Sequence, residues 1–370
     1  MADEFLLFKG SRQVTLGLEW ELQILDRKSL DLADRIQWVL EALPEVPWIK
    51  PELIQSCVEI ASKVCTGLEE LKAHLEALLR QLQSVCSDLD LCLCGAGTHP
   101  FCRRLAKITP LPRYLKQKSL YGYLARSQIT FATHVHLGMP DAQTALKLMR
   151  EFKACLPVLI ALSANSPFWR GYPTGFACYR QRILASGRSY GIPPSFSDWA
   201  QFCRFFALMQ RAQVFASLRD IHWDIRPRPD LGTLEVRAMD AQSSLQDALA
   251  IAAFVQALAN YFLETSPEFR PSLVPRSLPW WLEKENYFQA TRLGSSARYL
   301  DDQGGIHPLR EIIEGLFQVL LTRAGRELQP YLRHLYRRWR EGLGWQRQLR
   351  IFWARRRVTA VVAELVAELC

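Results

Sequence analysis

Several segments of the sequence alternate apolar and polar residues, and this pattern restricts the possible folds more than any other feature. Residues 14–26 (VTLGLEWELQILD) and 129–137 (ITFATHVHL) have this period of two, and residues 53–64 (LIQSCVEIASKV) also read as a strand. A period of two predicts a β-strand with one face in a core. The other face carries acidic and histidine residues, so we expect an antiparallel sheet with one open face rather than a parallel sheet buried on both sides.

Helices and short strands are predicted for most of the remaining chain. Apolar residues at helical spacing and polar flanks predict helices at residues 33–43, 68–89, 144–162, 199–218 and 245–264, and an almost wholly helical chain from residue 315. Pro157 should kink or divide the third of these helices. Residues 91–94 read as a buried strand, 223–240 as two strands joined by a turn, and 163–194 as a long ordered loop. The chain is therefore predicted to be an α+β protein.

Composition excludes some classes of protein but does not identify the function. With 370 residues, 49% of them hydrophobic, the chain can bury a large core, which excludes a disordered or collagen-like protein. This length permits two or three domains, or one enlarged unit with a helical appendage, and we predict one large domain over residues 1–300 and a helical extension over residues 301–370. The net charge of +9 suits an anionic partner, such as nucleic acid, a membrane surface or a phosphorylated small molecule.

No export signal or membrane span is visible in the sequence. The first ten residues contain Asp3 and Glu4 where a secretory signal needs positive charge, and Gln or Glu interrupts the apolar runs at residues 248–259 and 358–369. We therefore expect a soluble, cytoplasmic protein without a membrane partner. The ten cysteines lack metal-ligand spacing and lie in apolar segments, so free, packed thiols are predicted.

Acidic and imidazole side chains on the predicted strands form a candidate metal site. The set consists of Glu19, Glu21, Glu59, the pair His134 and His136, and Glu235. Carboxylate oxygens are the ligands that Mg²⁺ and Mn²⁺ prefer, and such sites keep positions for water and substrate phosphate. Each residue alone is also compatible with a solvent-facing glutamate or a hydrogen-bonded core histidine.

A second candidate set is cationic. Arg180 and Arg182 lie in CYRQR, Arg226 and Arg228 in WDIRPRP, and Arg237 in LEVR. Guanidinium groups bind phosphate or carboxylate oxygens through paired hydrogen bonds, although structural ion pairing is the alternative for any one of them. The sequence has no phosphate-binding loop of the GxxxxGK[ST] type, so phosphate would have to be bound by arginine and metal.

Six ordered motifs resemble one known family. TLGLEWEL, VEIASKVC, GAGTHPF, THVHLG, IALSANSPFWRG with TGFACYRQR, and HWDIRPRPDLGTLEVRAMDAQSSLQDALAIAAFVQAL are similar to segments of the carboxylate–amine ligases of the bacterial glutamate–cysteine ligase type 2 family. The resemblance extends from about residue 15 to residue 292. It implies a glutamine-synthetase-like fold, which is a curved, mainly antiparallel sheet of about six strands with helices on one side. It also implies that ATP and Mg²⁺, or Mn²⁺, bind over the open face.

The resemblance also suggests roles for individual residues. It implies metal binding by Glu19, Glu21, Glu59, His136 and Glu235, and catalytic contacts by Arg180, Arg226 and Arg237. Substrate or nucleotide contacts are implied for Thr98, His99, His134 and Arg182. One departure concerns the first motif, because Trp20 stands where the family commonly has an acidic residue. Position 20 should face away from Glu19 and Glu21, so the metal face should be spared.

The expected function is ATP-dependent ligation of an amino acid carboxylate, with the γ-carboxylate of glutamate as first choice, to an amine such as cysteine. The expected route is an acyl phosphate, and the expected partners are these small molecules. A different acid–amine pair, or a ligase fold that has lost activity, is the alternative. A more remote alternative is nucleic-acid binding by the basic C-terminal helices. The sequence leaves open whether the chain forms a homodimer.

Overall fold

The centre of the protein is an antiparallel sheet. The computed structural model describes residues 6–11, 14–44 and 46–369, and in these residues seven strands form one sheet in the order β10-β11-β5-β1-β3-β2, with β4 also paired to β1. All pairings in this sheet are antiparallel. The strands are β1 (Leu16–Asp26), β2 (Ile49–Pro51), β3 (Cys57–Ala61), β4 (Leu91–Cys94), β5 (Ala132–Gly138), β10 (Ile225–Arg228) and β11 (Thr233–Asp240). The prediction of an α+β fold with a mainly antiparallel sheet is confirmed.

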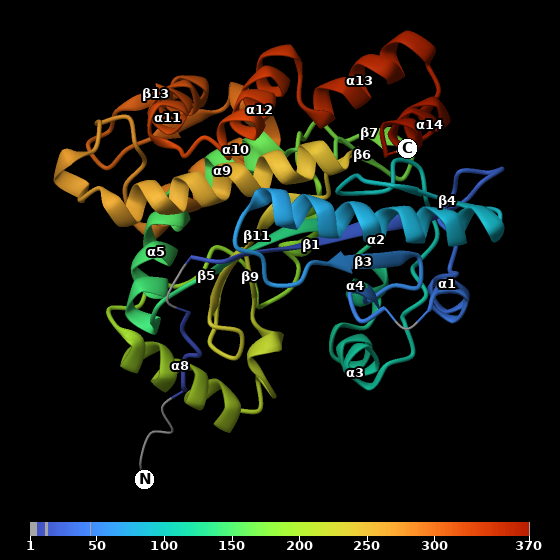
Figure 1. Ribbon diagram of the computed structural model, residues 1–370, viewed down its shortest axis with the longest axis horizontal. Helices are drawn as coiled ribbons and strands as arrows, with labels where there is room; N and C mark the ends of the chain where they lie inside the picture. Colours follow the sequence, from blue (N-terminus) through green and yellow to red (C-terminus); the bar gives the residue numbers. More distant parts are fainter. Residues whose placement is uncertain (1–5, 12–13, 45, 370) are drawn as a thin grey trace.

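Strand β1 shows how the alternating sequence gives the sheet two different faces. Leu18, Trp20 and Leu22 are fully or almost fully buried. They face the long helices α2 (Leu68–Asp88) and α9 (Leu245–Glu264), which lie side by side over the sheet in Figure 1. The residues between them, Glu19 and Glu21, point to the opposite face. One face of the sheet therefore forms the core, and the other is left for polar side chains.

The predicted helices are largely confirmed, with one division. The segment predicted as one helix over residues 144–162 forms α5 (Ala142–Ala154) and α6 (Leu156–Ser163), which meet at Cys155, two residues before Pro157. Proline has no main-chain N–H to donate, and its ring clashes with the carbonyl group one turn earlier in a helix. Pro157 therefore explains the break. The other predicted helices are α1 (Ile36–Ala42), α8 (Trp199–Arg211) and α9, and α8 ends seven residues earlier than predicted.

Some segments differ from the sequence-based expectation. The strand predicted over residues 53–64 joins the main sheet only over β3. Before β3, Ile54 bridges to Ile108, the main-chain N–H of Gln55 donates to the carbonyl oxygen of Lys107 (2.9 Å), and the chain turns at residues 54–57. The long loop over residues 163–194 contains short elements, including α7 (Arg180–Leu184). Helices α3 (Pro112–Tyr121), α4 (Tyr123–Ser127) and α10 (Trp280–Leu293) were not predicted. Small two-stranded sheets pair β6 (Phe168–Trp169) with β7 (Tyr172–Pro173), β8 (Tyr190–Gly191) with β9 (His222–Trp223), and β12 (Arg298–Leu300) with β13 (Ile306–Pro308).

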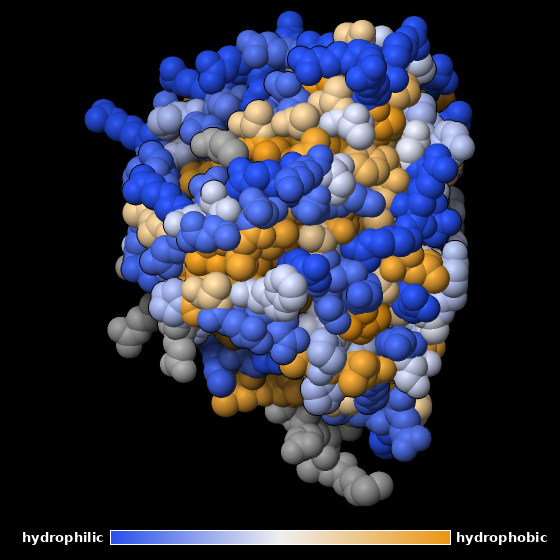
Figure 2. Space-filling model, turned by 90° about the vertical axis from the view of Figure 1, so that its right-hand side faces the viewer, coloured by the Kyte–Doolittle hydropathy of each residue, from blue (hydrophilic) through white to orange (hydrophobic). Residues whose placement is uncertain are grey.

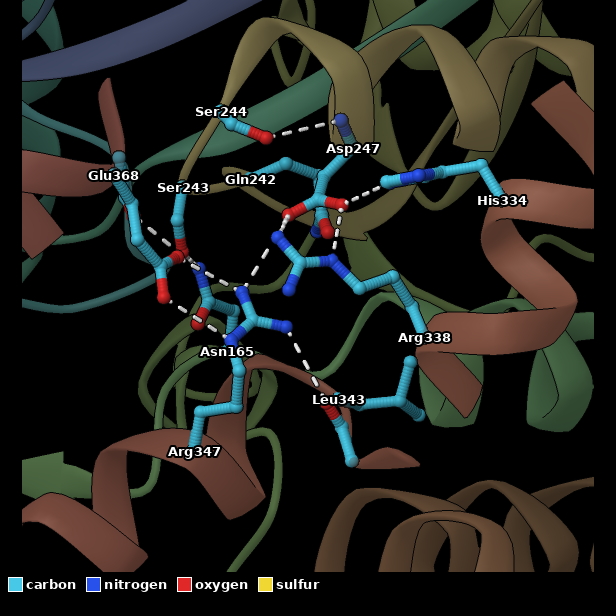
Figure 3. Close-up of polar contacts among 12 residues, drawn as sticks. Asn165, Gln242, Ser243, Ser244, Asp247, His334, Arg338, Leu343, Arg347 and Glu368 are labelled. Carbon is cyan, nitrogen blue, oxygen red and sulfur yellow. Dashed lines mark hydrogen bonds and ion pairs between the residues drawn. The ribbon is translucent and has the colours of Figure 1, made fainter. Parts of the chain in front are cut away.

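The C-terminal part of the chain is helical, as predicted, and packs on the rest. It comprises α11 (Leu309–Arg323), α12 (Gln329–Glu341), α13 (Gly344–Arg355) and α14 (Val358–Leu369). In Figure 1, α11 and α12 lie above α9, whereas α13 and α14 lie beyond its right-hand end, where α14 packs on β4. Asp247 on α9 accepts hydrogen bonds from His334 (2.7 Å) and Arg338 (2.9 Å) on α12 (Figure 3). A division of the chain near residue 300 stays a prediction.

The surface, the helix lengths and the cysteines can be compared with the sequence-based expectations. On the side shown in Figure 2, hydrophilic residues interrupt the apolar ones. Each helix within the described ranges is too short or too polar to cross a membrane. The nine described cysteines are thiols that take part in no disulfide, as predicted, and Cys370 lies outside the described residues.

Candidate active site

A cavity of about 410 Å³ lies over the open face of the sheet. Seven of the predicted site residues line it: Glu19, Glu21, Glu59, His134, Arg180, Arg226 and Arg237. Two more predicted residues, His136 and Glu235, directly contact members of this set. Residues from at least five strands are thus brought together above one sheet face.

Strand register explains this convergence. Glu19 on β1 lies opposite His134 on β5, and Glu21 lies opposite Glu59 on β3. Glu235 on β11 lies opposite His136 on β5. Residues directly opposite each other in a sheet project from the same face, so the alternating sequence of each strand is sufficient to bring these groups together once the strands pair.

Glu19 is held between two histidines. One of its oxygens lies 3.0 Å from Nδ1 of His134 and the other 3.3 Å from Nε2 of His136. Burial alone would raise the pKa of Glu19, but the nearby His136 and the hydrogen bond from His134 hold it well below its usual value. Burial and the nearby Arg237 lower the pKa of His134 to about 4. Glu19 is therefore a carboxylate and His134 a neutral imidazole at neutral pH.

His134 keeps one ring nitrogen for a ligand. A carboxylate can only accept hydrogen bonds, so Nδ1 of His134 donates to Glu19 and Nε2 of the neutral ring carries a lone pair. Nε2 is buried and has no hydrogen-bond partner among the described residues. Ligand atoms of Glu19, His134 and Glu235 lie within 4.8 Å of one another, and Nδ1 of His134 is 3.0 Å from Glu19 and 4.0 Å from Glu235. This group could hold a metal ion if the ion took the place of the Nδ1 proton.

Three carboxylates form a second candidate metal group. Oxygen atoms of Glu21, Glu52 and Glu59 lie within 4.8 Å of one another. Burial, followed by the charge of Glu52, raises the pKa of Glu21 to about 8, and burial with the charges of Glu19 and Glu52 raises the pKa of Glu59 well above its usual value. Crowded, partly buried carboxylates of this kind repel one another, and a divalent cation would relieve the repulsion. The donor set therefore fits Mg²⁺ or Mn²⁺.

Glu235 is surrounded by arginines. Its carboxylate accepts from Arg226 (2.7 and 3.1 Å), from Arg228 (3.3 Å) and from Arg237, and its side chain is fully buried. Burial alone would raise the pKa of Glu235, but Arg226 and Arg237 hold it well below its usual value. Both oxygens of Glu235 are thus occupied by guanidinium groups, so metal binding by Glu235, which stays a prediction, would compete with these ion pairs.

The three predicted catalytic arginines differ in how free they are. Arg226 also donates to the main-chain oxygens of Ile221 and Arg219 (3.4 Å for the latter), so its guanidinium is fully engaged. Arg180 donates to the carbonyl oxygens of Ala238 (3.5 Å) and Arg237 (3.3 Å), while its buried Nε has no hydrogen-bond partner in the described part of the chain. Arg180 is therefore freer than Arg226 to bind an anion.

Three predicted substrate or nucleotide residues lie outside this cavity. The hydroxyl of Thr98 donates to the carbonyl oxygen of Phe168 (2.8 Å). The ring of His99 contacts the carbonyl oxygen of Leu30 (3.0 Å) and accepts from the N–H of Cys102 (2.9 Å). Both side chains are fully buried and hold loops together.

Arg182 packs above aromatic rings. Its guanidinium carbon lies 5.9 Å from the ring centre of Tyr287 and 5.7 Å from that of Phe288. The described cavity lining does not include Arg182, Thr98 or His99. Direct ligand contact by these three residues is thus unsupported by the geometry.

Several cavity residues were not found from the sequence. Glu52 lies in the turn between β2 and β3, and Arg113, Tyr114 and Gln117 come from α3. They carry no motif, and only the tertiary fold brings α3 to the open face. Glu52 follows Pro51 at the end of the short strand β2, outside any alternating pattern.

Known proteins agree with this architecture. The family model for glutamate–cysteine ligase family 2 matches residues 15–366. The chain belongs to this family. It is 46% identical over 364 residues to a protein of Trichormus variabilis named "Putative glutamate--cysteine ligase 2", covering 98% of this chain and 94% of the relative. A protein of the same name from Gloeobacter violaceus is 36% identical, with 98% of both chains covered.

Solved structures share the fold at low identity. A bifunctional glutathione synthetase from Pasteurella multocida has a TM-score of 0.67 at 14% identity, and the match covers 96% of this chain and 52% of that protein. A glutamate–cysteine ligase from Francisella tularensis, solved in complex with AMP, has a TM-score of 0.66 at 12% identity, covering 98% and 93% of the two chains. At these identities the likeness concerns the fold alone. Membership of the family makes this protein an ATP-dependent carboxylate–amine ligase.

Proposed function

We propose that this protein joins the γ-carboxylate of glutamate to an amine such as cysteine through an acyl phosphate. The observation that carries the proposal is the position of the acidic group of Glu21, Glu52 and Glu59 beside Arg180 and Arg237 in one cavity. The acidic group alone would suit many metal proteins, and the arginines alone would suit many anion sites. Together they suit a reaction between a nucleotide phosphate and a carboxylate.

The chemistry requires activation because a carboxylate is a poor electrophile. A carboxylate oxygen attacks the γ-phosphorus of ATP, the bond from this phosphorus to the bridging oxygen breaks, and ADP leaves. The amine then loses a proton to solvent, its lone pair attacks the acyl carbon, and the bond between this carbon and the phosphate oxygen breaks. The products are an amide, ADP, phosphate and one proton.

The residues of the cavity would divide this work. Arg237 and Arg180 would bind the oxygens of the phosphoryl group and of the carboxylate, because guanidinium groups can donate two parallel hydrogen bonds. Glu235, Arg226 and Arg228 would fix the position of Arg237 through their ion pairs. A divalent ion such as Mg²⁺ or Mn²⁺, held by Glu21, Glu52 and Glu59, supplies positive charge beside the phosphates when bound.

His134, His136 and Glu19 would form the floor of the site. Glu19 is a carboxylate at neutral pH, and Nδ1 of His134 lies 3.0 Å from Glu19 and 4.0 Å from Glu235. These groups provide a second place where a cation could bind, next to Glu235. We assign this group to nucleotide or metal binding rather than to proton transfer, because His134 is already neutral and hydrogen-bonded to Glu19.

The acyl phosphate can be tested with labelled oxygen. Purified protein, Mg²⁺, ATP, cysteine and glutamate labelled with ¹⁸O in its γ-carboxylate should release phosphate that carries one ¹⁸O atom, because the carboxylate oxygen stays with the phosphate. ADP formation should require both the acid and the amine. Arg103→Ala, which changes an arginine outside the cavity, serves as the control for Arg180→Ala. Phosphate without ¹⁸O, or no turnover with any acid–amine pair from folded protein, would overturn the proposal.

A further inference from the structure

A second cavity of about 300 Å³ adjoins the first. The two cavities share the lining residues Arg113, Gln117, Arg219 and His222, so they meet at a common wall. Helix α3, which supplies two of these residues, lies on the side of the sheet opposite to α2 and α9 (Figure 1). The second cavity therefore opens beside the polar face and away from the core helices.

The second cavity is cationic. Arg113, Lys116, Arg188 and Arg219 line it, and among the described residues none of them forms an ion pair with a carboxylate. The acidic residue of the lining, Asp220, is occupied by the main-chain N–H groups of Ala216 (2.7 Å) and Ser217 (3.0 Å). Cations gathered without acidic partners favour an anionic ligand.

The same cavity has an apolar part. Leu120, Val214 and Phe215 line it, and Leu120 is 54% exposed although it lies on a structured helix. An exposed leucine is not unusual by itself. Here, however, it stands next to a half-buried valine and a buried phenylalanine inside a hollow that also contains cations. This combination suits a ligand with one anionic and one apolar group.

We propose that the second cavity binds the amine substrate and selects an α-amino acid with an apolar side chain. Its carboxylate contacts Arg113, Lys116 and Arg219, its side chain faces Leu120 and Phe215, and its amino group points through the common wall into the first cavity. This inference rests on the proposed function, because it names the second substrate of the same site.

Size and charge argue against the nucleotide as occupant. Ligand pockets span roughly 300–1,000 Å³, and the second cavity is at the lower limit, which suits an amino acid better than a nucleoside. An adenine ring is neutral and would leave the cations unpaired. The triphosphate of ATP also has the acidic metal group of the first cavity as its natural place.

The test compares amines in steady-state kinetics at saturating ATP and glutamate. We expect the kcat/KM for L-leucine to be about tenfold or more above that for leucinamide, which has the same side chain but no carboxylate. The loss of one charge-assisted contact costs about this factor. Titration calorimetry of leucine and leucinamide with the resting protein gives a second readout that needs no turnover.

Matched variants of α3 separate the cavity from the helix surface. Lys116→Ala and Leu120→Gln change residues of the lining, whereas Lys118→Ala and Leu115→Gln change exposed residues of the same helix outside it. Both lining variants should raise the KM for leucine by about five- to tenfold and leave the KM for ATP unchanged, and both controls should behave as the wild type.

Each other outcome is decisive. If the lining variants raise the KM for ATP instead, the cavity binds the nucleotide and the inference is wrong. The inference is also wrong if the lining variants leave both the kinetics and the leucine affinity unchanged. If the protein turns over no acid–amine pair but leucine binds and Lys116→Ala weakens its binding, the proposed function fails while the ligand class of this cavity stands. Turnover without preference for an apolar amino acid overturns the inference alone.

Discussion

The indole nitrogen of Trp20 donates a hydrogen bond to the main-chain oxygen of Gln242, 3.1 Å away, on the helix-covered face of the sheet. Trp20 is fully buried, while Glu19 and Glu21 on either side of it line the cavity. The residue that interrupts the acidic run of the first motif is therefore a core residue. The cavity keeps both carboxylates that the strand period assigns to it.

The first prediction follows from this position. Trp20→Phe keeps an aromatic ring but removes the donor to Gln242, and should lower the free energy of unfolding by about 1–3 kcal/mol, since it leaves a buried carbonyl oxygen without its partner. Trp20→Glu, which introduces an acidic residue between Glu19 and Glu21, should destabilise the fold more strongly because a charge would enter the core. Denaturant unfolding measures both. Unchanged stability with tighter Mg²⁺ binding in Trp20→Glu would show that position 20 faces the cavity.

Glu235 and Glu21 should respond in opposite ways to the same substitution. Glu235→Gln removes the carboxylate that Arg226, Arg228 and Arg237 share, leaves the buried Arg226 without an anionic partner, and should lower the free energy of unfolding by about 3–5 kcal/mol. At Glu21, burial and the charge of Glu52 raise the pKa to about 8, so the group is mostly protonated at neutral pH in the metal-free protein and a neutral amide changes its charge little. Glu21→Gln should therefore leave the stability of the metal-free protein unchanged or raise it.

Unfolding of both variants in chelator compares the two sites directly. Glu21→Gln should still lose Mg²⁺-dependent activity, because it removes a proposed ligand. Equal destabilisation of the two variants would contradict the distinction between a carboxylate held by arginines and one crowded by other carboxylates.

The strand faces were the part of the site that the sequence could predict. The two-residue repeat of a β-strand places Glu19 and Glu21 on one face and Trp20 on the other. It also places His134 and His136 on the same face, and neither placement depends on the rest of the fold. The division of the helix at Pro157 is likewise local, since a proline ring acts on its own helix. These predictions needed no knowledge of distant contacts.

Tertiary packing decided the rest. Glu52 and the cavity residues of α3 reach the site only because loops bring them to the sheet edge, and no local pattern marks them. The motif containing Thr98 and His99 was correctly found, yet its side chains hold loops through Phe168 and Leu30. Resemblance identifies a segment that matters, but it does not distinguish a residue that binds a ligand from one that supports the fold.

A prediction on pH concerns Asp247, which anchors the C-terminal helices to α9 (Figure 3). Burial alone would raise the pKa of Asp247, but the bond from His334 and the charge of Arg338 hold it well below its usual value. A carboxyl group with a lowered pKa in the folded state stabilises the fold above its unfolded pKa of about 3.9, and this stabilisation is lost as the pH falls toward the folded value.

The difference in unfolding free energy between wild type and Asp247→Asn should therefore be largest at neutral pH and should shrink below about pH 4. Asp198→Asn provides the control, because Asp198 is a half-buried cap of α8 and asparagine caps helices about equally well. A difference that is independent of pH would assign the effect to packing rather than to the carboxylate charge.

The C-terminal helices also reach the active site through a buried chain of hydrogen bonds. Gln348 on α13 donates to the side-chain oxygen of Asn165 (2.8 Å), and the main-chain N–H of Asn165 donates to Asp240 (2.8 Å). Ser166 donates to Asp240 (2.6 Å) and accepts from the main-chain N–H of Arg180 (3.1 Å). The backbone of Arg180 is thus fixed by a network that begins in α13.

Gln348→Ala should lower kcat by about tenfold while leaving the KM for ATP within about threefold, because a misplaced Arg180 would mainly affect the reacting groups. Arg350→Ala, an exposed position on the same helix, should have little effect. A loss of stability without any change in kcat would make Gln348 a purely structural residue.

Arg237 gives the last prediction, because its guanidinium contacts Glu235 and lines the cavity between the two candidate metal groups. Lysine retains the charge but not the two parallel donors. If Arg237 binds the transferred phosphoryl oxygens, Arg237→Lys should lower kcat by roughly 100-fold while ATP affinity stays within about fivefold, since the contact forms chiefly in the transition state. Arg228→Lys is the matched control, because Arg228 also contacts Glu235 but has a second partner in Asp230 (2.9 Å). Equal kinetic losses in both variants would mean that the buried charge balance around Glu235, rather than contact with the substrate, is what the reaction needs.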